Sequence, residues 1–237
     1  MGNIIVGIHQ PNFMPWLGYF YKIWQSDIFI FLDDAQFQKT GSNYTNRVSI
    51  IINHNKKNVT LPVKRVSGTS KINEVKINNQ KWKEKIWKSI QSSYGKAPFF
   101  YIHKELIFEL ILYETDNLAE YNMNFIRVIC NELYIKTKLI TSSTFDIRTT
   151  STQRLVNLIQ CVNGNIYLSG SGGDNYQNNT LYRGENIKLI YNKVPMFKYS
   201  QLRRDDFISG LSIIDAIFNI GMDELRNNFF SRGKIDE

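Results

Sequence analysis

The stretch that decides the fold is IIVGIHQPNFMPWLGYFYKIWQSDIFIFLDDAQFQK, residues 4–39. Residues 3–9 and 27–34 are apolar runs rich in isoleucine, valine and phenylalanine, and each predicts a buried strand. Between them, apolar and aromatic residues recur at spacings of three and four, which is typical of a helix with one apolar face. We expect Asn12 as the N-cap of this helix and Pro15 in its first turn. Strand, helix and strand in this order predict a βαβ unit with parallel strands.

The remaining sequence alternates between strand and helix patterns. It predicts a hairpin over 47–64, a short strand at 70–77, three helices within 79–135, a strand at 138–143, a helix at 151–164 capped by Ser151, strands at 165–169 and 187–192, and a late helix interrupted at Gly221. We therefore expect the α/β class, as a Rossmann-like, mostly parallel sheet with a central helical insertion at residues 79–135. No linker or internal repeat divides the sequence, so residues 1–237 are expected to form one domain.

The composition suits a protein with a sizeable core. Of the 237 residues, 43% are hydrophobic and 14% aromatic. No apolar run approaches the length of a membrane span, and the N-terminus resembles no signal peptide, so a cytoplasmic location is expected. Cys130 and Cys161 lie in apolar helical contexts without metal-ligand neighbours. We expect two buried, reduced thiols and no zinc site at them.

The net charge is +8 and the sequence pI is about 9.3. An excess of positive charge suggests nucleic-acid binding. However, the lysines and arginines are scattered, and no more than two are adjacent in the sequence. A protein acting on a nucleotide, a phosphorylated carrier or an acidic surface has the same balance. The charge pattern therefore disfavours nucleic-acid binding.

Polar residues follow both strands of the predicted βαβ unit. His9, Gln10 and Asn12 end the first strand just before a helix N-terminus, where free N–H groups favour phosphate or carboxylate. Asp33 and Asp34 end the second strand and are expected at the same edge of the sheet. His9 suits general acid–base chemistry, whereas the aspartates suit Mg²⁺, a sugar hydroxyl or a proton from an attacking amine. The alternative for one aspartate is that it caps the next turn.

Two further regions offer anion ligands. Arg47 begins one hairpin strand and Lys64 ends the other, so the two side chains can lie close together and hold phosphate or carboxylate. For Lys64 the alternative is a solvated surface charge. The glycine-rich segment 169–173 offers a backbone nest, although its spacing is not that of a Walker or dinucleotide loop. The catalytic candidates are His9, Asp33 and Asp34, and the substrate-binding candidates are Gln10, Asn12, Trp16, Tyr19, Gln36, Lys39, Arg47, Lys64, Ser169, Gly170, Gly172 and Tyr176.

Taken together, these motifs resemble the WbqC-like protein family over nearly the whole chain. The resemblance rests on HQPNFMPWLGYFYKI, FLDDAQFQK with NR and LPVK behind it, YLSGSGGDNY, and YSQ followed by LSIIDAIFNIG. The family occurs in bacterial O-antigen and surface-polysaccharide gene clusters. The resemblance implies transfer of an amino acid, such as glycine, to an amino sugar.

The opening strand, proline-containing turn and helix are also similar to pantothenate synthetase and other nucleotidylyl transferases of the HIGH-motif type. This chain departs from them because it carries Trp16-Leu17-Gly18-Tyr19 in place of their H-x-G-H motif. That weaker resemblance implies a related fold and the use of ATP.

Our hypothesis from the sequence is an enzyme that forms an amide on the amine of a nucleotide-linked amino sugar. His9 or Asp33 would remove the amine proton. The acyl donor would be either an adenylate, made with ATP and Mg²⁺, or an aminoacyl carrier such as aminoacyl-tRNA. The alternatives are a nucleotidyl or glycosyl transferase, and a non-catalytic sugar-nucleotide-binding protein of the same pathway. Apolar helices within 96–135 are a candidate homodimer face.

Overall fold

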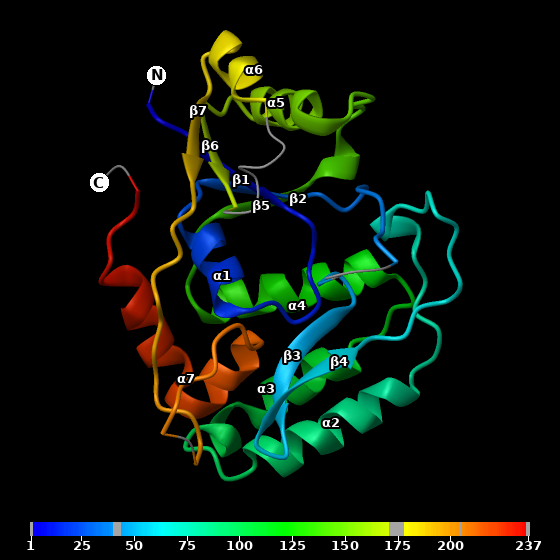
Figure 1. Cartoon of the computed structure of the whole chain (residues 1–237), viewed down its shortest axis with the longest axis vertical. Helices are drawn as coiled ribbons and strands as arrows, with labels where there is room; N and C mark the ends of the chain where they lie inside the picture. Colours follow the sequence, from blue (N-terminus) through cyan, green and yellow to red (C-terminus); the bar gives the residue numbers. More distant parts are fainter. Residues whose placement is uncertain (1, 40–43, 171–177, 204, 236–237) are drawn as a thin grey trace.

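A five-stranded parallel sheet forms the centre of the computed structural model, which describes residues 2–39, 44–170, 178–203 and 205–235 (Figure 1). Its strands are β1 (Ile5–His9), β2 (Ile28–Phe31), β5 (Lys138–Thr141), β6 (Ile166–Ser169) and β7 (Lys188–Tyr191). Every pairing in this sheet is parallel, and the strand order is β5-β2-β1-β6-β7. The predicted α/β class with a Rossmann-like, mostly parallel sheet is confirmed. The order reverses between β1 and β6, and ligands of such sheets bind beyond the strand ends at that point.

Helices cover both faces of the sheet (Figure 1). On one face lie α1 (Leu17–Trp24), α4 (Leu118–Glu132) and α7 (Ile213–Phe230); on the other lie α5 (Ser151–Cys161) and α6 (Asn179–Gly184). Side chains alternate along a strand, so Val6 and Ile8 pack in the cluster beneath α5 while His9 falls on the α1 face. Gly7 lies on that face too. A Cβ there would stand 2.4 Å from Oγ of Ser26, in the turn after α1, so the glycine leaves room for this turn against the sheet.

A long insertion separates β2 from β5. It contains the antiparallel hairpin of β3 (Arg47–Ile52) and β4 (Asn55–Thr60), the short 3₁₀ helix η1 (Ile72–Glu74), α2 (Lys81–Tyr94), α3 (Phe100–Leu112) and α4. The hairpin and the three helices predicted within 79–135 are therefore present. A second 3₁₀ helix, η2 (Ser142–Thr144), follows β5 directly. Tyr101, Ile102 and Leu112 of α3 are exposed, and the homodimer stays a prediction.

Two local predictions about helix starts are wrong. Helix α1 begins at Leu17 with Trp16 as its N-cap, so Asn12 does not cap it and Pro15 precedes it. The loop between β1 and α1 is longer than the sequence suggested, because its residues are held by distant segments. Helix α5 has Thr150 as its N-cap and Ser151 as its first residue.

Two further predictions are wrong. Residues 70–77 contain η1 and isolated bridges in place of a strand, because their backbone pairs with the segment after β2, as in the bond from Ile72 N to Ala35 O. Cys161 is exposed at the end of α5, whereas Cys130 is buried as expected.

The interruption expected at Gly221 is present as a kink within α7. Its φ of 77° lies in the left-handed region, and a Cβ there would stand 2.7 Å from the Phe99 ring. Within the described ranges, no helix combines the length and the apolarity needed to cross a bilayer.

Asn122 of α4 connects the loop after β1 to the start of β3. This fully buried side chain donates from Nδ2 to Pro11 O at 2.9 Å and to Thr45 O at 2.7 Å. We predict that Asn122→Ala lowers the free energy of unfolding by about 2–4 kcal/mol, because two buried carbonyls lose their donor. Chemical denaturation followed by circular dichroism measures this loss.

The matched control is Asn131→Ala, on the same helix but exposed. It should change the free energy of unfolding by no more than about 0.5 kcal/mol. Equal effects of the two changes would show that Asn122 does not hold the two segments together.

Candidate active site

The carboxyl end of β1 is buried, and every carbonyl from Ile8 to Pro11 has a hydrogen-bond donor. Three of the four donors are side chains from other parts of the fold. In chain order of the carbonyls, the donors are Lys22 Nζ at 2.7 Å, Leu32 N at 2.8 Å, Tyr19 OH at 2.9 Å and Asn122 Nδ2 at 2.9 Å. This strand end and the loop after it are therefore held in one conformation.

Two distant segments are hydrogen-bonded to that loop. Phe13 N donates to Tyr44 O at 2.9 Å, which brings the start of β3 alongside. Ile213 N donates to Pro15 O at 2.9 Å, and with the bridge between Trp16 and Ser212 this bond brings the start of α7 to the loop. Ser212 N also donates to Ser49 O of β3 at 2.8 Å. Met14, inside the loop, has a φ of 41° and so sits in the left-handed region, a strained backbone of the kind that gathers at functional sites.

These three segments enclose a cavity of about 370 Å³, here called the His9 cavity. Its volume is in the range of small-molecule sites. Four predicted site residues line it: His9, Asn12, Trp16 and Arg47. The other lining residues are Phe13, Pro15, Tyr44, Val48, Ser49, Lys56 and Gly210. The structure thus gathers residues from opposite ends of the chain around one histidine.

His9 is a neutral imidazole at pH 7. Burial, and then the charge of Lys22, lower its pKa to about 4, against the opposing effect of its bond to Gln10 O. Nδ1 lies 3.0 Å from that carbonyl, so Nδ1 carries the proton and Nε2 is left as an acceptor. The Tyr19 ring meets the imidazole edge-on, with centroids 5.1 Å apart, and fixes its orientation. Predicted as a substrate ligand, Tyr19 is buried behind His9.

Lys22 is a residue of this site that the sequence analysis missed. It is only 3% exposed, and burial lowers the pKa of its ammonium group to about 7. The sequence contains a sign of this burial, because Lys22 is the only charged residue in the apolar and aromatic segment 17–24. Every residue of α1 is in fact buried, which leaves the lysine no route to solvent.

Two cations border the His9 cavity. Arg47 Nε donates to Thr60 Oγ1 at 3.2 Å, and Lys56 Nζ donates to Ser209 O at 2.7 Å. Neither bond neutralises the charge, so both groups can attract a phosphate or carboxylate. Lys56 was not predicted. Lys64 is exposed and does not line the cavity; its backbone N bonds to Lys76 O instead.

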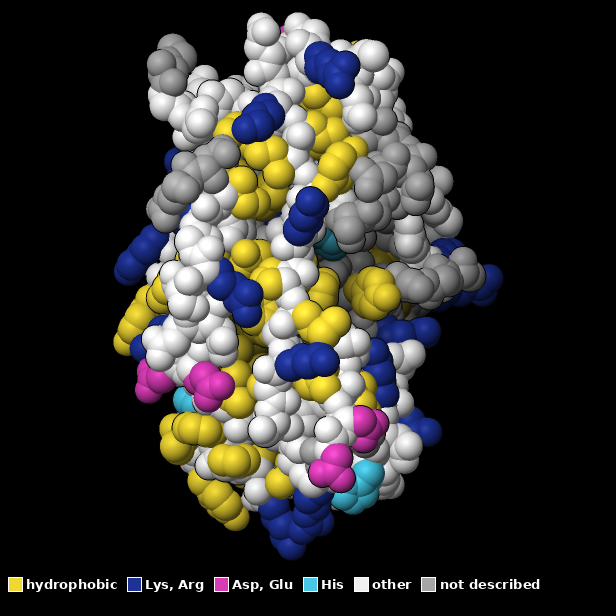
Figure 2. All heavy atoms as spheres, turned by 60° about the vertical axis from the view of Figure 1, so that its left-hand side comes forward, with side chains coloured by type: hydrophobic (Ala, Val, Ile, Leu, Met, Phe, Trp, Pro, Cys, Tyr) yellow, Lys and Arg dark blue, Asp and Glu magenta, His cyan; other side chains and the backbone are white. Residues whose placement is uncertain are grey.

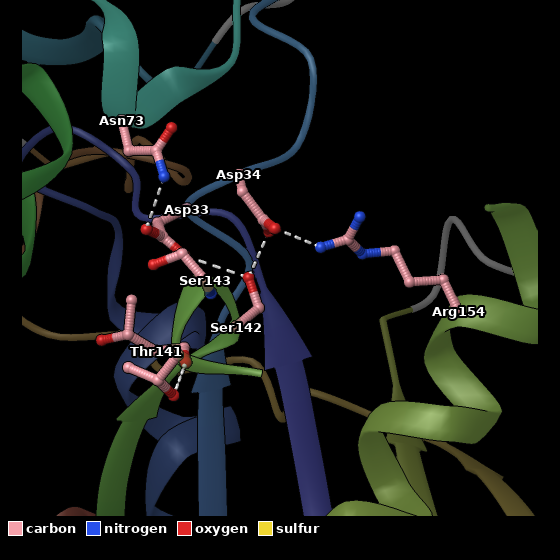
Figure 3. A network of polar contacts seen from close by, with 8 residues as sticks. Asp33, Asp34, Asn73, Thr141, Ser142, Ser143 and Arg154 are labelled. Carbon is pink, nitrogen blue, oxygen red and sulfur yellow. Dashed lines mark hydrogen bonds and ion pairs between the residues drawn. The ribbon is translucent and has the colours of Figure 1, made fainter. Parts of the chain in front are cut away.

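Asp33 does not line the His9 cavity. Its side chain lies among Asn73, Ser142 and Ser143 (Figure 3). It is 3% exposed, and it accepts from Asn73 Nδ2, Ser142 Oγ and Ser143 N, each at 3.0 Å. Both carboxylate oxygens are therefore occupied, and the carboxylate joins the end of β2 to η1 and η2.

Asp34 belongs to the same network (Figure 3). It accepts from Ser142 Oγ at 2.5 Å and is paired with Arg154 of α5. The Ser142 hydroxyl has one hydrogen and can donate to only one of the two aspartates at a time. Asp34 borders a separate open cleft of about 910 Å³ beside η2. In the described ranges no group of three or more His, Cys, Asp or Glu side chains is placed to hold a metal ion.

The remaining predicted ligands are dispersed. Gln10 accepts at Oε1 from Thr45 Oγ1 at 3.4 Å, near the cavity. Ser169 is buried at the end of β6, next to β1, and Gly170 follows it. Gln36 is exposed and donates to Gly68 O, and Lys39 is exposed. Gly172 and Tyr176 lie outside the described residues. None of the five described residues among them lines the His9 cavity, and the binding roles of all seven stay predictions.

Figure 2 shows one face of the molecule, with lysine and arginine side chains spread among apolar and uncharged ones. They do not gather there into one continuous basic surface. The low expectation for nucleic-acid binding stays a prediction.

We predict that Lys22 makes stability rise with pH between about 7 and 10.5. The unfolded chain keeps the lysine proton up to its ordinary pKa of 10.5, whereas the folded chain loses it near 7. Between these values the unfolded state binds more protons, so raising the pH favours folding. In Lys22→Met this contribution is absent. The unfolding free energy of the wild type minus that of the variant should therefore increase by up to about 1.4 kcal/mol per pH unit from pH 7 to 9.

Urea denaturation at several pH values measures this gap, and Lys57→Met, at an exposed position, is the control. Nuclear magnetic resonance adds a second test. In Lys22→Met the pKa of His9 should rise from about 4 but stay below 6.5, because burial remains. A pH-independent gap together with an unchanged His9 titration would refute the role given to Lys22.

Comparison with known proteins agrees with the motifs. The model of the WbqC-like protein family matches residues 10–227. The uncharacterized protein Rv1507c of Mycobacterium tuberculosis (strain ATCC 25618 / H37Rv) is 30% identical over 220 residues, which cover 91% of this chain and 94% of that protein. No solved structure matches the chain. The similarity therefore extends over almost the full length of both chains.

Proposed function

The chain belongs to the WbqC-like protein family, and we propose that it joins an amino acid or another acyl group to the amine of a nucleotide-linked amino sugar. The observation that carries this proposal is the His9 cavity, where an acceptor imidazole lies in one pocket with two cations. A proton acceptor and an anion site are what amide formation on a sugar nucleotide requires. We place the reaction in surface-polysaccharide synthesis in the cytoplasm.

The proposed reaction begins with the diphosphate of the sugar nucleotide between Arg47 and Lys56. The sugar amine then faces His9. Its nitrogen attacks the acyl carbonyl carbon, and the new C–N bond forms as the bond to the leaving group breaks. The amine becomes acidic as this bond forms, and Nε2 of His9 accepts the proton. Because His9 is already neutral at pH 7, the imidazole needs no earlier deprotonation, and the sugar amine reacts in its unprotonated form.

The acyl donor is either an adenylate, formed with ATP and Mg²⁺, or an aminoacyl carrier such as a charged tRNA. We assign no step to a resident Mg²⁺, because Asp33 accepts hydrogen bonds from Asn73 Nδ2 and Ser143 N on its two oxygens and Asp34 is paired with Arg154. For the same reason His9, and not Asp33, is the base of this proposal.

A reaction matrix tests the proposal. The protein is incubated with dTDP- or UDP-linked 3-amino and 4-amino sugars, glycine or other amino acids, ATP and Mg²⁺, with and without charged tRNA. Mass spectrometry then follows the sugar nucleotide. Gain of an acyl residue supports amide formation, and the component that is required identifies the donor. Release of pyrophosphate or nucleoside diphosphate without an acylated product would favour a nucleotidyl or glycosyl transferase instead.

We predict that His9→Ala lowers the rate of amide formation by about 10²–10⁴-fold, because the proton acceptor is lost. Binding of the sugar nucleotide should weaken much less, since Arg47 and Lys56 remain. The control His103→Ala changes a histidine on α3 outside the cavity and should leave the rate unchanged. Equal rates for His9→Ala and wild type would remove His9 from the mechanism.

We also predict that Arg47→Ala and Lys56→Ala each weaken sugar-nucleotide binding by about tenfold or more, through loss of a charged contact to phosphate. Calorimetry measures the dissociation constants. The matched control is Lys57→Ala, because Lys57 is an exposed neighbour on β4 and does not line the cavity. A similar loss in Lys57→Ala would indicate a general charge effect in place of a phosphate site.

A further inference from the structure

A second cavity, of about 230 Å³, adjoins the His9 cavity and is called the Trp16 pocket here. Its lining comes from the start of α1 and from residues within 194–199 and 207–211, most of which are apolar or aromatic. Trp16 and Gly210 line both cavities, so the two share a wall. A group attached to a ligand beside His9 can therefore extend into the Trp16 pocket.

The Trp16 indole, which borders both cavities, is held in place by its neighbours. Trp16 forms a bridge with Ser212, and a Cβ at Gly18 would stand only 2.3 Å from the indole ring. Gly18 thus leaves the space in which the indole lies against the first turn of α1. Trp16 is nevertheless 43% exposed. An aromatic surface that is ordered before binding receives an apolar group at a lower entropic cost.

The segment after β7 forms the other side of the Trp16 pocket, and it runs past α1 and along α7 (Figure 1). The Phe197 ring packs on Tyr21 of α1, with centroids 5.5 Å apart. The Tyr199 hydroxyl donates to Asp215 at 2.7 Å. The Phe207 ring meets the Tyr199 ring edge-on, with centroids 5.1 Å apart. These contacts fix the aromatic side chains of the pocket, so its shape exists before a ligand binds.

The two adjoining cavities differ in charge. Among the described residues, none that lines the Trp16 pocket is charged, whereas Arg47 and Lys56 line the His9 cavity. Neither lining, within the same described ranges, includes an aspartate or a glutamate. A buried ammonium group without a counter-charge is costly. The α-amino group of an amino acid is largely protonated at pH 7, so neither cavity suits an aminoacyl group.

We propose that the Trp16 pocket binds the hydrocarbon part of the acyl group, so that the group transferred is an uncharged acyl chain and not an aminoacyl group. This inference rests on the function proposed above. Arg47 and Lys56 hold the diphosphate, the sugar amine faces His9, and the acyl chain extends past Trp16 into the apolar pocket. Removal of the chain from water stabilises the complex.

Binding of acylated sugar nucleotides tests the pocket without any turnover. The probes are dTDP-linked 3-amino and 4-amino sugars whose amine carries an acetyl, propanoyl, butanoyl or glycyl group, and calorimetry on the full chain measures their dissociation constants. Each methylene added from acetyl to butanoyl should tighten binding by about threefold to fourfold, because it is buried.

The glycyl and propanoyl probes are a matched pair, because they differ only in a terminal ammonium group against a methyl group. The propanoyl probe should bind about tenfold or more tightly than the glycyl probe. Equal affinities along the acetyl-to-butanoyl series, tighter binding of the glycyl probe, or no binding of any probe would each overturn the proposal.

Val194→Phe narrows the Trp16 pocket. The gain from acetyl to butanoyl should then fall to less than about twofold, while the affinity for the acetyl probe stays within about twofold of wild type. The control Val66→Phe enlarges another half-buried valine, which lines neither cavity, and should keep the full gain. An undiminished gain in Val194→Phe would overturn the proposal.

A nucleobase is the competing occupant of the Trp16 pocket. Its polar edge needs hydrogen-bond partners, and the Tyr199 hydroxyl there already donates to Asp215. The unacylated sugar nucleotide distinguishes the two occupants. If Val194→Phe weakened binding of this compound as much as that of every acylated probe, the pocket would hold the nucleobase and the proposal would fall.

Met196→Ala gives an independent result, because Met196 lines the pocket but is 73% exposed and contributes little to the core. Binding of the butanoyl probe should weaken by about threefold, and that of the acetyl probe by less. The control is Ile102→Ala, which removes an exposed apolar side chain from α3. Equal effects of the two variants on the butanoyl probe would overturn the proposal.

The reaction matrix described above separates this inference from the proposed function. Acylation in the matrix, together with binding that does not depend on chain length, would overturn the Trp16 pocket alone. Binding that strengthens with chain length and loses this gain in Val194→Phe would support the pocket, even if no donor acylates the sugar and the proposed reaction falls.

Discussion

The structure depends on one constraint, which is that the carbonyls at the end of β1 must be hydrogen-bonded where water does not reach. β1 lies at the centre of the sheet, and its end is largely covered, with Ile8 and Pro11 buried and His9 and Gln10 half-buried. Buried carbonyls without donors are costly. Lys22 of α1, Tyr19 of α1 and Asn122 of α4 supply most of the donors, and these contacts determine where both helices lie.

The same constraint determines the chemistry of His9. Lys22, which donates to Ile8 O, is buried together with its charge. Its charge lowers the pKa of the imidazole further than burial alone does. Both effects favour the neutral ring. The hydrogen bond to Gln10 O then places the proton on Nδ1, so Nε2 is the nitrogen with a free lone pair. Structural hydrogen bonding and the preparation of a proton acceptor thus come from the same few contacts.

The β3–β4 hairpin borders a second cavity besides the His9 cavity. This cavity, of about 540 Å³, lies at the hairpin turn and is lined by the buried Asp215 and the exposed Lys96 and Arg203. Both cavities are also bordered by the region before or within α7, which is hydrogen-bonded to the hairpin through Ser212 and Ser49. A hairpin inserted between two strands of the sheet is therefore the element that turns a common fold into a specific site.

The sequence by itself determined the parallel βαβ unit, the hairpin, the helices of the insertion and the place of His9 at a strand end. These follow from periodicities over a few neighbouring residues, which the local chain encodes. Only the tertiary structure decided which polar groups meet. Asp33 and His9 end adjacent strands, yet Asn73 and Ser142 bind the carboxylate away from the histidine, while Asn122 and Phe13 bring Arg47 to it. Such partners lie tens of residues away in the sequence, so no local pattern reveals them. Which polar groups meet depends on which hydrogen bonds can form once the groups are buried together.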